Sequence, residues 1–278
     1  MKRYSLLLGF LVSSLCCFGY EPVDEPYAPL EASSSFYPSF SDNPTLALQM
    51  RQLMRPYLLP MTHPIKPILD ALFQKSRVID SEKGLIDAGF TVLFSQPRSF
   101  IRVVKHPSLP GYLLKIYLDT DTNRLEGEAG WERLTKRCII AEKIRNIIEY
   151  HGVKTLVVPE KWIYPLPVPQ QPQQGQQPVI LIVKDMNICN REETKVAWKT
   201  KATATTIKEL FTVLSYGYGS ASLSNNIPYT KSGTFAFIDT EFKNGKMVSI
   251  ERPKKYFSPE MQAYWQELIE AHRREGGV

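Results

Sequence analysis

Two oxygen-bearing side chains in the second half of the chain have the types and the spacing of ligands for a hard cation. Asn226 follows a glycine-containing loop, and Asp239 ends the apolar run FAFI at 235–238. Residues 205–241 predict a helix, a loop and two short strands, so the amide and the carboxylate would emerge from adjacent strand ends. Because hard cations such as Mg²⁺ prefer oxygen ligands, this stretch predicts a metal site at Asn226 and Asp239.

The elements that would complete such a site lie upstream. Three short runs rich in β-branched and aromatic residues, separated by turn sequences, predict strands. These runs are residues 90–94, 100–105 and 112–118. A helix is predicted at 130–150, where apolar residues recur at helical spacing. The third strand carries Lys115, and the helix carries Glu132, seventeen residues further along the chain.

This order of elements resembles the protein-kinase-like fold, in which a catalytic loop ending in Asn-Ile, a hairpin and an apolar strand lead to a metal-binding Asp. Asn226 and Asp239 are thirteen residues apart, as in that pattern, and Ile227 follows the Asn. Thr240 follows the Asp where protein kinases have Phe, which is similar to small-molecule kinases of the same fold. The resemblance implies an α+β protein with two lobes, namely a small antiparallel N-lobe sheet and a shortened helical C-lobe.

The resemblance also implies a nucleotide site. Lys115 corresponds to the strand lysine that pairs with phosphates. Glu132 is the first choice for the helix glutamate that pairs with this lysine, and Glu128 and Glu142 are the alternatives. ATP and Mg²⁺ are the cofactors that such a site implies.

Departures from the pattern argue against phosphate transfer. The position of the catalytic base, five residues before Asn226, is Ala221, and residues 95–99 contain no glycine where the family places a glycine-rich phosphate cover. Only 39 residues follow Asp239, fewer than a full C-lobe contains. We therefore expect a pseudokinase that acts as a binding module for a protein partner or a nucleotide. The alternative is an active, atypical Mg²⁺-dependent phosphotransferase, since loose phosphoryl transfer relies chiefly on positioning and charge.

An architectural account of the same residues stays open. Asn and Asp side chains commonly cap turns and helices, and a lysine on an alternating strand, such as Lys115, commonly points to solvent. On that account the spacing is a coincidence, and the chain is an envelope-associated structural protein. Proximity of Lys115 to Asp239 would support the kinase-like interpretation, whereas a wide separation would exclude it.

The N-terminus predicts export. A basic start followed by an apolar run predicts that residues 1–19 are a signal peptide, with lipidation of Cys16 or Cys17 as the alternative. Residues 20–44, rich in Pro, Ser and Tyr, predict a disordered linker. The expected location is the periplasm, the cell envelope or outside the cell. The globular part is then 45–278, with a helical extension at 45–80, an N-lobe at 85–185 and a C-lobe at 186–278.

Composition limits the partners. With 43% hydrophobic and 22% charged residues among 278, the chain is an ordinary globular protein, and its net charge of +6 is too evenly spread to indicate nucleic acid. No apolar run beyond the N-terminus reaches membrane-spanning length. Signal cleavage would leave Cys138 and Cys189, which permit one disulfide, although a helical position favours core packing for Cys138.

The remaining segments carry coarser predictions. Residues 155–158 and 179–183 are expected to form a hairpin around a Pro- and Gln-rich loop, which is a surface insertion or, alternatively, a ligand for a groove-type partner. Residues 184–189 would be the hinge between the lobes. Ser258 and Pro259 have the types of a helix N-cap and a first helical residue. Further helices are expected at 46–58 and 67–75.

Overall fold

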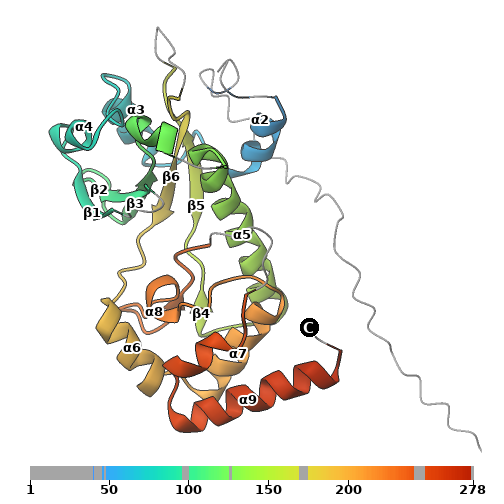
Figure 1. Cartoon of the computed structure of the whole chain (residues 1–278). Helices are drawn as coiled ribbons and strands as arrows, with labels where there is room; N and C mark the ends of the chain where they lie inside the picture. The colour runs from blue at the N-terminus through green and yellow to red at the C-terminus, as the bar shows by residue number, and fades with distance from the viewer. Residues whose placement is uncertain are drawn as a thin grey trace, which may run out of the picture. The chain divides into compact units, whose positions relative to one another are not determined.

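A computed structural model describes residues 40, 46, 48–95, 100–124, 127–168, 175–240 and 248–276 (Figure 1). All of them belong to one compact unit, residues 33–278. Within them the fold is α+β, with a five-stranded antiparallel sheet, a short parallel strand pair and eight α-helices, which confirms the predicted class. The predicted signal peptide and, except for Phe40, the predicted linker lie outside the described residues. None of the described helices is long and apolar enough to cross a bilayer.

The large sheet has the strand order β1-β2-β3-β6-β5. The strands are β1 (Thr91–Ser95), β2 (Arg102–Lys105), β3 (Tyr112–Ile116), β5 (Lys161–Pro165) and β6 (Val179–Lys184). The first three, which were predicted as strands, pair in sequence as an antiparallel meander, and β6 then joins β3 with Lys115 opposite Leu181. Strand β6 is buried along almost its whole length because it is central in the sheet and apolar on both faces.

The predicted hairpin between 155–158 and 179–183 is wrong. The short strand β4 (Leu156–Val157) pairs in parallel with β7 (Phe235–Ala236), whereas the antiparallel partner of β6 is β5. Pro159 lies between β4 and β5 and has no N–H for a ladder. It therefore separates the extended run into two strands, each of which pairs with a different sheet.

Helix α5 (Gly130–Tyr150) matches the predicted helix and connects two hydrophobic cores. Leu134 and Cys138 belong to the core under the large sheet, whereas Ile144 and Ile147 belong to the core among the C-terminal helices. The helix contacts β5 and β6 and also α7 and β4 (Figure 1). Cys138 is a buried free thiol, which confirms that it packs in the core.

The other helices agree with the sequence where a clear signal exists. They are α2 (Leu48–Met54), η1 (Arg55–Tyr57), α3 (Lys66–Phe73), α4 (Glu82–Asp87), η2 (Asp119–Arg124), α6 (Arg191–Thr200), α7 (Ala204–Ser215), α8 (Leu223–Asn226), η3 (Arg252–Tyr256) and α9 (Pro259–Arg274). The Ser258 side chain caps α9 by accepting from the Met261 N–H, as predicted. Helix α2 gives way to a 3₁₀ turn earlier than expected, because Pro56 cannot donate in an α-helix.

Candidate functional site

The segment that follows β7 carries Asp239 and lies beside Asn226. After β7, the Phe237 N–H donates to the Val157 carbonyl (2.9 Å), and the Ile238 N–H donates to the Asn226 carbonyl (3.1 Å). Backbone hydrogen bonds therefore fix Asn226 beside the residue that precedes Asp239. The two predicted metal ligands come together through the backbone, at the point where α8 ends and the β7 segment passes.

The loop before α8 holds the Asn226 side chain. Its Nδ2 donates to Ser220 Oγ (2.7 Å), so the side-chain oxygen is the atom that a cation could use. Gly219 has φ +97°, and a Cβ there would lie 2.8 Å from Leu214 and 3.0 Å from Phe237. Only glycine fits, and the loop can thus pack directly on the β7 segment. Ala221, in this loop, offers only a methyl group at the expected base position.

Lys115 reaches this neighbourhood from the large sheet. It lies on β3, is 9% exposed, and its Nζ donates to the carbonyl of Ile238 (3.1 Å). The side chain points into the protein. Its aliphatic stem can pack in the interior, and its ammonium group has a hydrogen-bond acceptor there. Lys115 and Asp239 are therefore brought together, as the kinase-like interpretation requires, and the solvent-facing alternative for Lys115 is wrong.

Asp239 is held by an arginine that the sequence analysis did not single out. The Arg137 guanidinium, on α5, forms an ion pair with the Asp239 carboxylate. The Arg137 side chain is 3% exposed and that of Asp239 is 31% exposed. Arg137 is on the buried stripe of α5 with Leu134, Cys138 and Ala141. A cation on an apolar helical stripe is the signal that would have found it, because a buried charge requires a partner.

A second lysine lies at the same strand end. Lys161, on β5, is 7% exposed, and its Nζ donates to Thr240 Oγ1 (2.6 Å) and, at 3.4 Å, to the Ile238 carbonyl. The Thr240 hydroxyl in turn donates to the Arg137 carbonyl (2.6 Å). These bonds connect β5, α5 and the residues after β7. Burial, followed by the charge of Lys115, lowers the pKa of Lys161 well below its usual value.

The helix glutamates do not join this cluster. Glu132 pairs with Lys136, one turn further along α5, at 3.6 Å. Glu128 pairs with the same lysine, and Glu142 accepts from the Tyr57 hydroxyl (2.6 Å). Helix α5 thus presents Arg137 to the strand end, and among the residues described none of the three predicted glutamates pairs with Lys115 there.

The donor set fits a divalent cation poorly. The Asp239 carboxylate is already bound by a buried guanidinium, and the ammonium groups of Lys115 and Lys161 meet the carbonyl of the preceding residue. A dication would have to displace Arg137 and stand close to the Lys115 ammonium, which repels it. Among the described residues there is also no group of three or more His, Cys, Asp or Glu side chains arranged to hold a metal ion.

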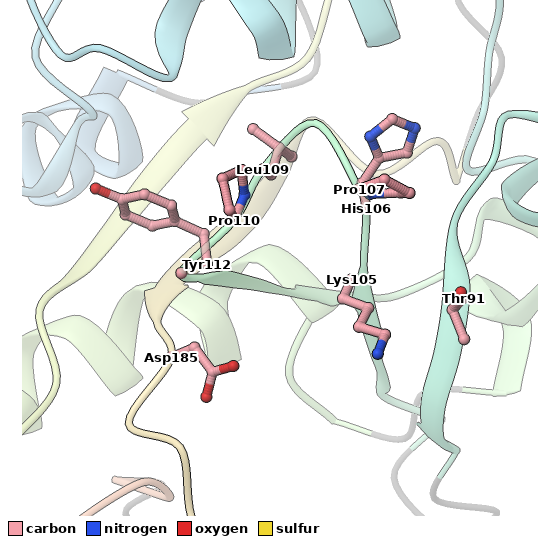
Figure 2. Close-up of a pocket in the computed structure, with 9 residues that line it drawn as sticks. Thr91, Lys105, His106, Pro107, Leu109, Pro110, Tyr112 and Asp185 are labelled. Atoms are coloured by element: carbon pink, nitrogen blue, oxygen red, sulfur yellow. The ribbon is translucent and has the colours of Figure 1, made fainter. Parts of the chain in front are cut away.

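A hollow of about 370 Å³ lies elsewhere, at the turn between β2 and β3 (Figure 2). Figure 2 shows the His106, Lys105 and Asp185 side chains among the residues that line this hollow. His106 is engaged at both ring nitrogens, with the Ala88 carbonyl (3.2 Å) and the Ser108 N–H (3.1 Å). None of the four predicted site residues lines the hollow, so it is separate from the strand end.

The chain was compared with known protein families and with curated proteins. Neither the scan against protein-family models nor the search of curated proteins finds a match for the chain.

Proposed function

We propose that the chain is a degenerate member of the kinase-like fold that does not transfer phosphate and works as a binding module for a protein partner. The observation that carries the proposal is the ion pair between Arg137 and Asp239. It engages the carboxylate that the fold would use for Mg²⁺. The position of the base, Ala221, is consistent with the same loss.

Three features support the kinase-like part of the proposal. The antiparallel sheet is followed along the chain by helical elements, and α5 stands between β3 and β5. The lysine of the third strand, Lys115, donates to the carbonyl immediately before Asp239 (3.1 Å). Asn226 is hydrogen-bonded through its backbone to the same segment. The resemblance led us to expect that Lys115, Asn226 and Asp239 would lie near one another.

We also propose that the protein is exported. The basic start and the apolar run of the N-terminal sequence support export to the envelope or out of the cell, where ATP is scarce. A protein partner is therefore a better-matched ligand than a nucleotide with Mg²⁺. The second candidate function, an atypical phosphotransferase, is favoured by the convergence of Lys115 and Asp239, but it requires Asp239 to leave Arg137. The third, an envelope-associated structural protein, needs no ligand at the strand end.

Thermal unfolding with ATP, with and without Mg²⁺, tests the proposal. A ligand at about 100 times its dissociation constant adds about 2.7 kcal/mol to the free energy of unfolding, which is easily detected. We expect no Mg²⁺-dependent shift of the wild-type chain. A Mg²⁺-dependent shift that Asp239→Ala abolishes and the surface variant Asp87→Ala retains would contradict the proposal and favour the phosphotransferase.

A further inference from the structure

A cavity of about 280 Å³ lies between η1, α5 and β5, and Lys161 of the strand end just described is one of its lining residues. Cys138, Ala141 and Lys161 are its buried lining residues, whereas Glu142 and Glu160 are exposed lining residues. The cavity is therefore lined both by exposed residues and by a buried lysine.

The amine of Lys161 is held by neutral oxygen atoms. Its two acceptors are Thr240 Oγ1 and the Ile238 carbonyl, and no carboxylate in the described part of the chain lies within ion-pair distance of its Nζ. Lys115 Nζ donates to the same carbonyl, so two amines share one acceptor. Burial without a counter-charge disfavours the ammonium form, and a second cation nearby disfavours it further.

Some of the groups that surround Lys161 lower its pKa and others raise it. Burial lowers its pKa most, Lys115 from β3 and Arg137 from α5 lower it further, and Asp239 and the Cys138 thiol raise it. The sum is a clear lowering, because desolvation and the two cations outweigh the carboxylate. A larger fraction of Lys161 then carries a free lone pair at neutral pH than an ordinary lysine does.

The charge of the cavity wall indicates the ligand. Glu142 accepts from the Tyr57 hydroxyl, and Glu160 pairs with Lys184 at 3.4 Å. Arg145 also lines the cavity, and within the described residues its guanidinium forms no ion pair. A ligand that carries a carboxylate would supply the missing partner for Arg145.

We propose that Lys161 is an amine nucleophile and that the cavity takes a small aldehyde or ketone bearing a carboxylate. The Lys161 nitrogen attacks the carbonyl carbon with its lone pair and forms a carbinolamine. Loss of water then gives an imine, in which both amine protons leave with the former carbonyl oxygen. No oxidant or reductant is consumed in this step, and Arg145 orients the carboxylate end of the ligand.

The test is reductive labelling of the full chain at neutral pH. The probe is 4-oxobutanoate with cyanoborohydride, which traps an imine as a stable secondary amine, and peptide mass spectrometry locates the modified lysines. Lys66 is the matched control, since it is also 7% exposed. Each unit of lowered pKa raises the free-amine fraction about tenfold, so we expect Lys161 to react at least about tenfold faster than Lys66. Equal or slower labelling of Lys161 overturns the proposal.

Two variants separate binding from reactivity. Arg145→Gln should slow labelling of Lys161 by 4-oxobutanoate but leave labelling by the neutral probe butanal unchanged. Lys115→Met should slow labelling by both probes and move the pH profile of labelling upward, because the neighbouring positive charge is gone. Unchanged selectivity in Arg145→Gln would overturn the carboxylate assignment, and an unchanged pH profile in Lys115→Met would overturn the role of Lys115. Far-ultraviolet circular dichroism checks that each variant is folded.

Discussion

Two lysines in this protein are equally buried and differ in their partners. Lys66, at the start of α3, is 7% exposed and pairs with Asp70 at 2.5 Å, while the Tyr164 hydroxyl also donates to that carboxylate (2.8 Å). Lys161, on β5, is 7% exposed, donates to two neutral oxygens, and within the described residues forms no ion pair, although the Asp239 carboxylate is near enough to oppose part of the lowering of its pKa. Burial alone therefore does not set the chemistry of an amine. The presence of a carboxylate decides whether its charged form is stabilised.

The two sites also differ in what surrounds them. Lys66 and Asp70 are one turn apart in the same helix, so local sequence supplies the pair. Lys161 lies where β5, α5 and the segment after β7 meet, and its acceptors are 77 and 79 residues away in the chain. The first site is a local structural pair. The second depends on the tertiary structure, beside a cavity and beside the ion pair between Arg137 and Asp239.

The largest effect is expected from Asp70→Ala. It leaves the buried Lys66 ammonium without its carboxylate, so the chain should lose about 3 kcal/mol of unfolding free energy at pH 7. Urea denaturation measures this loss. The exposed pair between Lys83 and Asp87 supplies the control, because Asp87→Ala should cost less than about 1 kcal/mol. Equal losses in the two variants would remove the basis of the comparison.

The Cys138 thiol, beside Lys161, should make a smaller, pH-dependent contribution to the free energy of unfolding. Burial raises the pKa of Cys138 from 9.0 to about 12, so the unfolded chain releases this proton from about pH 9 while the folded chain keeps it. The stabilisation is present below pH 9 and falls by up to about 1.4 kcal/mol per pH unit above it. Urea titrations of the wild type and Cys138→Ala between pH 8 and ~10.5 measure the difference. Parallel curves would show that the thiol titrates alike in both states.

The smallest effect is expected from Lys161→Met at pH 7. Loss of the bond to Thr240 costs about 1 kcal/mol, and relief of the desolvated charge offsets it, so the net change should stay within about 1 kcal/mol. The pH dependence has a definite sign. The folded pKa of Lys161 is lowered, so the wild type should gain stability relative to the variant as pH rises toward 10.5. A difference that is constant with pH, measured in the same urea titrations, would contradict the lowered pKa.

Local signals predicted much of the fold. The apolar spacing of 130–150 predicted α5, and Ser258 with Pro259 predicted the start of α9. Helical periodicity and helix capping are both set by residues close together in the sequence. Helix α6 was missed although Asn190 and Glu193 form a capping box at its start. The pairing of β4 with β7 was not predictable from local pattern, because two-residue strands gain their ladder only from tertiary contacts.

The candidate site was predictable in part, because the sequence shows the order and spacing of some of its residues. The order and spacing of Lys115, Asn226 and Asp239 indicated that they would converge, and the backbone and side-chain hydrogen bonds of the strand end bring them together. Arg137 and Lys161 were missed because charged side chains are normally expected to face solvent. The position of Arg137 on the apolar stripe of α5 indicated its burial, but the partners of both residues lie far along the chain, so no local pattern identified those partners.

A double-mutant cycle between Arg137 and Asp239 tests the central claim most directly. The free energy of unfolding is measured for the wild type, Arg137→Met, Asp239→Ala and the double variant, each with and without ATP and Mg²⁺. If the carboxylate is the internal partner of Arg137, the coupling energy should be about 2 kcal/mol and should not change when ATP and Mg²⁺ are added. A coupling near zero, together with Mg²⁺-dependent stabilisation that requires Asp239, would show instead that the carboxylate is a metal ligand.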